Sequence, residues 1–287
     1  MKILILGGSG FIGSHVADEL SNLSHDVTIF DIKKSTYIKK NQKFIKGNIC
    51  NNSSLQKNFK NFQIVINFAG LADLDEAYSN PLKTAENNII GLINILNACK
   101  KHKIKKFIHA SSIYANSKEG SFYSASKRCA EDFIEEFNKK HNLKYVILRF
   151  GSLYGPRADK NNGINTIIKN ISEKNELRYS GSKKASRRYI HVKDASKVCV
   201  QILNKKYENT CINITGKKKI TINKMFKKIS KIFGIKRIKF LNVKNSGHYD
   251  SKPTPYKLRE SKNLFINKER DFYKSFLELT KKNYKLS

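Results

Sequence analysis

Short apolar runs alternate with amphipathic stretches through the first half of the chain. The runs are rich in Ile, Val and Phe, which is typical of strands that are buried on both faces of a parallel sheet. Strands are predicted over residues 2–6, 27–30, 43–45, 64–68, 106–110 and 145–150. Helices are predicted between them over residues 12–23, 54–60, 81–101 and 123–141. Six strands with intervening helices indicate an α/β fold with a Rossmann-type doubly wound parallel sheet.

The pattern changes after Phe150. Three glycines and Pro156 mark a loop between residues 151 and 163, because glycine and proline commonly interrupt regular elements. Later helices are predicted over residues 164–172, 192–203 and 222–233, the last capped by Thr221, and a Lys-rich helix is predicted after Pro255. No Gly/Ser-rich tether separates the two halves. We therefore expect a first domain over residues 1–150 and a smaller α/β domain over residues 151–287, partly interleaved with the first.

Composition limits the class of protein. The chain has 287 residues, 39% of them hydrophobic, and no apolar run approaches the ~18 residues that a membrane-spanning helix needs. The five cysteines are dispersed without metal-ligand spacing, and none of the seven histidines pairs with another at a four-residue interval. We expect free thiols, no metal site, no membrane span and a location in the reducing cytoplasm.

The formal net charge of +33 raises the question of nucleic-acid binding. Of the 56 basic residues, 47 are lysine and 9 are arginine, although arginine is the better partner for phosphates and base edges. The excess therefore predicts a solvated Lys-rich surface and no nucleic-acid partner. The charge is uneven, +9 over residues 1–150 and +24 over residues 151–287, which would attract an anionic small molecule to the second half.

A glycine-rich segment follows the first predicted strand and opens the first predicted helix. Its sequence, GGSGFIG over residues 7–13, satisfies both the GxxGxxG and the GxGxxG spacing. Glycines suit this place because the turn is tight and the backbone must come close to a pyrophosphate. The helix N-terminus also offers unpaired N–H groups to the phosphates. The segment predicts a dinucleotide-binding site.

Asp31 ends the second predicted strand, 18 residues beyond Gly13. A carboxylate at this place can accept hydrogen bonds from both hydroxyl groups of an adenosine ribose, which favours NAD over NADP. Lys33 and Lys34 follow closely and could bind a 2′-phosphate. NAD is therefore the expected cofactor, and NADP is the alternative.

Tyr123 and Lys127 lie four residues apart on a predicted helix, so both side chains project from one face. A tyrosine is a poor base at its ordinary pKa of about 10. A nearby ammonium group and a positively charged nicotinamide ring favour the phenolate and so lower that pKa. Ser111 and Ser112 close the fifth predicted strand, where a hydroxyl group could hold the same substrate oxygen. The set predicts a proton-transfer site.

Further segments match a known family in the same order along the chain. They are GGSGFIG at 7–13, Asp31, GNI at 47–49, NFAG at 67–70, NNIIGLIN at 87–94, SSIYA at 111–115, YSASK at 123–127, RFGSLYGPR at 149–157 and RRYIHVKD at 187–194. With these motifs the sequence resembles the extended short-chain dehydrogenases/reductases, and among them the NAD-dependent nucleotide-sugar epimerase/dehydratase family.

The resemblance implies a role for each matched residue. Tyr123 would be the catalytic acid/base, Lys127 would bind the nicotinamide ribose and lower the pKa of the tyrosine, and Ser112 would polarise the substrate oxygen. Ser152 would contact the substrate, and Arg187 would bind its diphosphate, for which a guanidinium group is well suited. The residues implied to bind NAD are Gly7, Gly10, Phe11, Ile12, Gly13, Asp31, Asn48, Ile49, Phe68, Ala69 and Gly70, together with Tyr123 and Lys127.

The sequence also departs from the family pattern. Asn48 stands in place of an adenine-binding Asp, and Ser152 stands in place of an Asn. Ala115 replaces a Gly, and the loop from Ser112 to Tyr123 is short, so either Ser111 or Ser112 could be the catalytic serine. Sugar-nucleotide 4,6-dehydratases typically carry Asp-Glu after the catalytic hydroxyl residue, where this chain has Ile-Tyr at 113–114. Dehydration is therefore disfavoured.

We therefore expect an NAD-dependent epimerase of a UDP-type nucleotide-diphosphate sugar, serving sugar-nucleotide or surface-polysaccharide biosynthesis. Tyr123 would move a proton while a hydride passes transiently to NAD. The alternatives are an NAD(P)-dependent keto-sugar reductase or dehydrogenase and a non-catalytic dinucleotide-binding scaffold. The resemblance alone implies a homodimer, paired through the predicted helices over residues 81–101 and 123–141.

Overall fold

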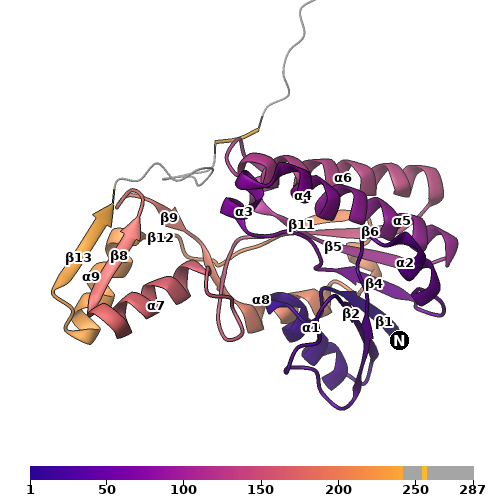
Figure 1. The fold of residues 1–287 in the computed structure, drawn as a ribbon, viewed down its shortest axis with the longest axis horizontal. Coiled ribbons are helices and arrows are strands. Elements are labelled where there is room, and N and C mark those ends of the chain that lie inside the picture. The colour runs from indigo at the N-terminus through magenta and orange to yellow at the C-terminus, as the bar shows by residue number, and fades with distance from the viewer. Residues whose placement is uncertain (242–253, 257–287) are drawn as a thin grey trace, which may run out of the picture. The chain divides into compact units, whose positions relative to one another are not determined.

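A parallel sheet of seven strands lies between two layers of helices (Figure 1). The computed structural model describes residues 1–241 and 254–256. Met1–Pro255 form one compact unit, to which all the elements below belong. The strand order is β11-β6-β5-β4-β1-β2-β3. The strands are β1 (Lys2–Leu6), β2 (Asp26–Asp31), β3 (Gln42–Lys46), β4 (Ile64–Asn67), β5 (Lys106–Ser112), β6 (Lys144–Phe150) and β11 (Thr210–Ile214). The predicted Rossmann-type sheet is confirmed.

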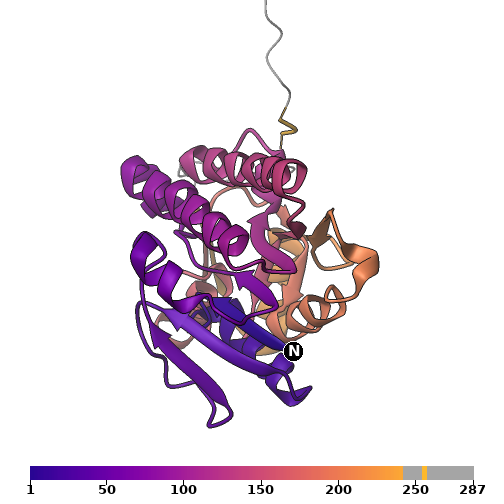
Figure 2. The ribbon, with the colours of Figure 1, turned by 90° about the vertical axis from the view of Figure 1, so that its right-hand side faces the viewer.

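Helices cover both faces of this sheet, as the apolar character of its strands requires (Figures 1 and 2). The first four apolar residues of β1, Ile3 to Leu6, are fully buried. One face packs against α2 (Asn52–Asn58), α5 (Gly91–Lys101) and α6 (Ser121–His141). The other packs against α1 (Phe11–Asn22) and α8 (Val192–Gln201).

The order of the strands creates a crevice at one edge of the sheet. From β1 the chain proceeds outward to β2 and β3, and then crosses to β4 on the other side of β1. At such a switch point the connections after β1 and β4 diverge, which leaves room for a ligand beyond the carboxyl ends of the strands.

The predicted helix over residues 81–101 is continuous, but its middle part is not α-helical. It consists of α4 (Pro81–Ala85), a π-helical turn η1 (Glu86–Ile90) and α5. Such π-helical turns occur frequently at functional sites. A short helix that the sequence pattern did not predict, α3 (Leu74–Ser79), precedes α4 and is capped by Asp73.

The elements after Phe150 are shorter and less buried. Besides α8, this part contains the helices α7 (Gly163–Lys174) and α9 (Ile222–Phe233). The Thr221 hydroxyl caps α9 as predicted. Six strands of this part of the chain form three separate pairs. They are β7 (Ser152–Tyr154) with β10 (Tyr189–His191), β9 (Ser186–Arg187) with β12 (Ile220–Thr221), and β8 (Glu176–Ser180) with β13 (Arg237–Leu241).

Two elements from the second half of the sequence belong to the central sheet and its cover. Strand β11 pairs with β6, and α8 lies against α1. A helix was predicted over residues 192–203, where α8 lies, but no strand was predicted at β11. The packing of both against the first half was expected only as partial interleaving, and the division at residue 150 stays a prediction. The Lys-rich helix predicted after Pro255 lies outside the described residues. Within residues 1–241 and 254–256, no helix has the length and apolar content to cross a membrane.

Candidate active site

Glycines let the turn between β1 and α1 pass close to neighbouring backbone. Gly7 has a φ of +72°, and a Cβ atom there would lie 2.5 Å from the backbone nitrogen of Ala69. A Cβ atom at Gly13 would lie 2.3 Å from the carbonyl oxygen of Gly7. Since no side chain tolerates such contacts, the turn depends on glycine at both positions. Bare backbone is thereby presented at the N-terminus of α1, where helix N–H groups attract phosphate.

A cavity of about 230 Å³ opens beside this turn, and we call it the Asp31 cavity. It is lined by Gly7, Gly10, Phe30, Asp31, Ile32, Gly47, Asn48, Ile49, Phe68, Ala69, Gly70 and Asn87. The backbone N–H groups of Ser9 and Lys33 donate to the two Asp31 carboxylate oxygens at 3.0 and 3.2 Å. The carboxylate is therefore held at the end of β2, beside the glycine turn.

Two observations test whether a dinucleotide fits this place. The Ser9 hydroxyl in the glycine turn is buried and, within the described part of the chain, has no hydrogen-bond partner. A buried polar group without a partner is costly, so a ligand that gives it a partner would be favoured. The glycines leave the space that a pyrophosphate needs, and Asp31 offers carboxylate oxygens near an expected ribose. The residues present fit NAD.

A second cavity, of about 340 Å³, shares Gly7, Gly10, Phe68 and Gly70 with the Asp31 cavity. We call it the Tyr123 cavity. Its other lining residues are Phe11, Ile12, Gly13, Leu71, Ala72, Ala110, Ser111, Ser112, Tyr123, Lys127, Phe150, Gly151, Leu153 and Asp159. The structure thus brings every predicted cofactor residue and the predicted catalytic set to two adjoining cavities.

Tyr123 and Lys127 lie on the face of α6 that packs against the end of β5. The Lys127 ammonium donates a hydrogen bond of 2.8 Å to the carbonyl oxygen of Ala110. It lies 5.7 Å from the centre of the Tyr123 ring. A hydrogen bond joins the hydroxyl groups of Tyr123 and Ser112. The three predicted catalytic side chains are therefore close together at one point of the Tyr123 cavity.

Burial dominates the electrostatics of this pair. It raises the pKa of Tyr123 above its ordinary value, and the hydrogen bond with Ser112 opposes that rise. Burial also lowers the pKa of Lys127 to about 8, against the attraction of the Glu131 carboxylate. In the protein alone the phenol is thus protonated at neutral pH. Added positive charge, such as that of an oxidised nicotinamide ring, would favour the phenolate.

The two candidate serines make different contacts. The Ser111 hydroxyl donates to the Glu131 carboxylate at 2.5 Å. The Ser112 hydroxyl bonds to Tyr123. Glu131 thus engages the Ser111 hydroxyl, and the Ser112 hydroxyl is the one of the two that contacts Tyr123. This geometry favours Ser112.

The side chain of Asn88 fixes the segment after β4 through hydrogen bonds. Its side-chain oxygen accepts from the N–H group of Leu71 at 2.7 Å, and its amide nitrogen donates to the Leu71 carbonyl oxygen at 3.0 Å. The same nitrogen donates to the Ser126 hydroxyl of α6 at 3.0 Å. Asn88 lies in the π-helical turn η1. The turn therefore joins one wall of the Tyr123 cavity to the catalytic helix.

A third cavity, of about 370 Å³, holds Ser152 and Arg187, and we call it the Arg187 cavity. The residues that it shares with the Tyr123 cavity are Ala72, Ser112, Phe150, Gly151 and Leu153. The Arg187 guanidinium is buried, and it donates to the Ser186 carbonyl oxygen at 3.0 Å and to the Tyr179 hydroxyl at 3.4 Å. A cationic group at this wall suits an anionic ligand.

Sequence reasoning missed several residues of these cavities. Tyr179 and Tyr189 line the Arg187 cavity, and Asp159 lines the Tyr123 cavity. All three lie in short elements or loops after Phe150, where no strong pattern marks them. Glu131 was also missed, although its position four residues beyond Lys127 was a usable signal.

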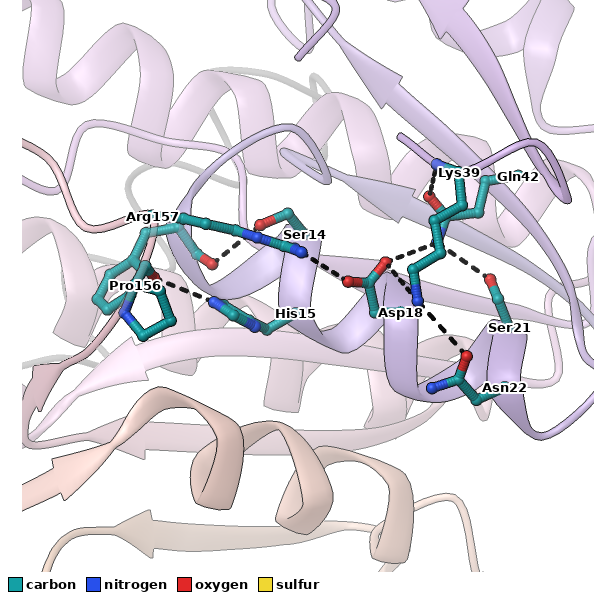
Figure 3. Close-up of polar contacts among 10 residues, drawn as sticks. Ser14, His15, Asp18, Ser21, Asn22, Lys39, Gln42, Pro156 and Arg157 are labelled. Atoms are coloured by element: carbon teal, nitrogen blue, oxygen red, sulfur yellow. Dashed lines mark hydrogen bonds and ion pairs between the residues drawn. The ribbon is translucent and has the colours of Figure 1, made fainter. Parts of the chain in front are cut away.

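A polar network joins α1 to the segment after β7 and to the segment that leads into β3 (Figure 3). The Asp18 carboxylate accepts from Arg157 at 2.8 Å and from Gln42 at 3.1 Å, and Lys39 lies 3.5 Å away. Arg157 follows β7, whereas Lys39 and Gln42 belong to the connection after β2 and to β3. His15 bonds the Pro156 carbonyl oxygen at 3.0 Å. The segment leading to Arg157 is thereby fixed to the helix of the glycine turn.

The fold and the site together define a Rossmann-type protein with a Tyr–Lys pair beside its dinucleotide crevice. The chain belongs to the NAD dependent epimerase/dehydratase family, whose model matches residues 3–215. This membership confirms the family resemblance and NAD as the cofactor.

Individual relatives carry both activities in their names. A putative UDP-glucose 4-epimerase of Methanocaldococcus jannaschii is 30% identical over 245 residues, which are 78% of this chain and 80% of that protein. A dTDP-D-glucose 4,6-dehydratase of Dictyostelium discoideum is 31% identical over 67% of this chain and 53% of its own length. The family alone therefore does not decide between epimerase and dehydratase.

Among solved structures, the UDP-glucuronic acid 4-epimerase of Bacillus cereus in complex with UDP-glucuronic acid and NAD matches with a TM-score of 0.79. It is 26% identical, and the match covers 90% of each chain. Residues 1–150 alone could not give this coverage. The likeness to that structure therefore includes elements after Phe150.

Proposed function

We propose that this protein is an NAD-dependent nucleotide-sugar epimerase that interconverts two stereoisomers of a UDP-sugar. The observation that carries the proposal is the position of Ser112 and Tyr123. They line the cavity that adjoins the dinucleotide crevice, and Ser112 also lines the cavity that holds Arg187. A sugar whose diphosphate lies at Arg187 can therefore reach the phenol. The names of the epimerase relatives support this assignment.

The chain's own residues would move one proton. The phenolate oxygen of Tyr123 would accept it from a sugar hydroxyl group, whose oxygen becomes a carbonyl oxygen, and would later return it. The Ser112 hydroxyl would donate a hydrogen bond to that oxygen, and the Lys127 ammonium would stabilise the phenolate. NAD held by the glycine turn and Asp31 would supply reversible hydride transfer at the carbon that carries this hydroxyl group, on either of its faces. The sugar is thus isomerised without net oxidation.

Residues after Phe150 would hold the nucleotide. Arg187 would bind the diphosphate through its guanidinium group, and Ser152 would contact the sugar. The high positive charge of this part of the chain would attract the anionic ligand. In this assignment residues 1–150 bind the cofactor and the residues beyond bind the substrate, and the reaction takes place in the cytoplasm.

One observation favours epimerisation over dehydration. Ile113 and Tyr114, which follow Ser112, line the Arg187 cavity. An elimination step needs a general acid and base near the sugar, and neither an isoleucine nor a tyrosine side chain replaces a carboxylate pair there. The keto-sugar reductase differs in its net chemistry, because it would consume reduced cofactor in proportion to product.

A ligand screen by thermal shift tests the proposed substrate class. The purified protein with excess NAD is heated alone and with UDP-, GDP- and dTDP-sugars. A ligand at a hundred times its Kd adds about 2.7 kcal/mol to the free energy of unfolding. We expect UDP-sugars to raise the Tm, and Arg187→Lys to reduce that rise. A protein whose Tm responds to none of these nucleotides would contradict the proposal.

A further inference from the structure

A buried carboxylate lies on the catalytic face of α6, one turn beyond Lys127. Tyr123, Lys127 and Glu131 are spaced at four-residue intervals, which places their side chains in one row along the helix. Their exposed fractions are 9%, 7% and 6%. Burying a carboxylate is costly unless it is paired and hydrogen-bonded. The partners of Glu131 therefore indicate what it does.

Glu131 binds two neighbouring strands. Arg149 of β6 donates from Nε to one carboxylate oxygen at 3.0 Å and from Nη2 to the other. The Ser111 hydroxyl of β5 donates to the first of these oxygens at 2.5 Å. Two-pronged binding of a carboxylate by arginine fixes its orientation as well as its charge. The carboxylate is thus held at the ends of β5 and β6.

Three consecutive residues at the end of β5 contact the three side chains of this row. The Ala110 carbonyl oxygen accepts from the Lys127 ammonium, and the Ser111 hydroxyl donates to Glu131. The hydroxyl of Ser112, the next residue, bonds to Tyr123. A displacement of Glu131 would therefore move the strand end that positions both Lys127 and Ser112.

Glu131 also acts on Lys127 through its charge. Burial lowers the pKa of Lys127 to about 8, and the Glu131 carboxylate opposes this fall. His109 of β5, the other titratable group affected by Lys127, has a pKa well below its ordinary value because it is buried, so it is neutral. Arg149 faces Glu131 from β6, Tyr123 precedes Lys127 on α6, and Asp159 lines the same cavity. Among these groups, Glu131 is the carboxylate that lies in the same row of α6 as Lys127 and pairs with Arg149.

We propose that Glu131 is a positioning residue of the proton-transfer site, which keeps Lys127 charged and holds Ser112 in register with Tyr123. This role rests on the proposed epimerase mechanism, in which a charged Lys127 stabilises the phenolate. Since Arg149 binds the Glu131 carboxylate, we expect its positive charge to offset part of the Glu131 charge and so to act on Lys127 in the opposite sense. The two residues therefore have opposing influences on Lys127 and a shared influence on stability.

The test compares Glu131→Gln with Arg149→Gln in two measurements. The first is the pH titration of the Lys127 side chain by NMR in isotope-labelled protein, assigned by the loss of its signal in Lys127→Met. The second is the pH profile of kcat/KM. Removing a nearby opposite charge shifts such a titration by about one pH unit. We expect the titration and the alkaline limb to move to lower pH in Glu131→Gln and to higher pH in Arg149→Gln.

Matched controls separate this role from a purely structural one. Asp132→Asn removes one negative charge from the next, exposed position of α6 and should leave both curves unchanged. Glu131→Asp keeps the charge and should restore most of the titration, even where its Tm is lower. Shifts of the same sign in Glu131→Gln and Arg149→Gln, or no shift in either, would overturn the proposal. If the wild-type protein isomerises no sugar, the proposed function fails, whereas the NMR titration still decides the influence of Glu131 on Lys127.

Discussion

The strands that lead to the dinucleotide crevice differ in burial from those that carry Ser152 and Tyr189 in the Arg187 cavity. In β1, β2 and β4 nearly every residue is buried, and helices cover both faces. In β7 and β10 every residue is half-buried, and each strand pairs with one partner. The cofactor side of the site is therefore built on the central sheet, and the substrate side is built on short, separate strand pairs.

This difference shows where specificity can vary. A glycine turn between buried strands permits few alternatives, because an added Cβ atom meets backbone within 2.3 to 2.5 Å. Side chains such as Ser152 and Tyr189, on half-buried strands, can change without disturbing a large core. The cofactor site should thus be intolerant of substitution, and the Arg187 cavity should be the part that selects the sugar.

Tyr123 lies where the two regions meet, and its loss should have the largest effect. Tyr123→Phe removes the proton-transfer group, and general acid–base catalysis contributes about 10²–10⁴-fold. We expect kcat to fall by about that factor, with the Kd values for NAD and for the UDP-sugar nearly unchanged. Turnover of a UDP-sugar and calorimetric titration of both ligands measure this. Tyr78→Phe, at an exposed position of α3, is the control, and equal losses in both variants would refute the role of Tyr123.

A substitution in the glycine turn should affect the cofactor side alone. In Gly13→Ala the new Cβ atom would meet the Gly7 carbonyl oxygen at 2.3 Å. Forcing such a contact costs about 1–3 kcal/mol, so the Kd for NAD should rise about tenfold or more. Gly163→Ala is the matched control, because a Cβ atom there meets nothing within 4 Å. Unchanged NAD binding in Gly13→Ala would contradict the proposal that the cofactor side is intolerant of substitution.

The converse substitution should affect the substrate side alone. Arg187→Lys keeps the charge but loses the two-pronged guanidinium group, so we expect KM for the UDP-sugar to rise about tenfold. The Kd for NAD should not change. Arg178→Lys, on the strand β8 outside the lining of the Arg187 cavity, serves as the control. A weaker affinity for NAD in Arg187→Lys would mean that the two sides are not separate.

The smallest effect is expected at the network that links the two regions. Asp18→Asn weakens the ion pair with Arg157, whose side chains are 14% and 20% exposed. The neutral amide can still bond to Arg157, so the loss in free energy of unfolding should be about 1 kcal/mol. KM and the Kd for NAD should both rise a few-fold. Thermal unfolding and ligand titration check this, with Asp26→Asn, at an exposed ion pair, as control.

Sequence patterns predicted the first region much better than the second. Each strand from β1 to β6 appears as an apolar run, because both faces of the sheet are covered by helices. Positions such as Gly7, Asp31 and Asn48 follow directly from the ends of these runs. Strand β11 was not predicted, since its sequence TCINI at the edge of the sheet is short and has polar residues at two of its five positions.

The contacts between distant segments could not be predicted in either region. No local pattern shows that Asn88 bonds to Leu71 or that Ser111 bonds to Glu131. These contacts depend on the packing of a helix against a strand far away in the sequence. The π-helical turn at Asn88 is likewise set by tertiary contacts, because the sequence around it has ordinary helix periodicity.

The most direct test of the central claim follows sugar and cofactor in one reaction. The NAD-loaded protein is incubated with the UDP-sugar that raises its Tm most. NMR reads the stereochemistry of the sugar, and near-ultraviolet absorbance reads reduced nicotinamide. We expect one stereoisomer to convert into the other until equilibrium, with the absorbance ending where it began, and neither change in Tyr123→Phe. Net gain or loss of reduced cofactor in proportion to product, or isomerisation that persists in Tyr123→Phe, would contradict the account.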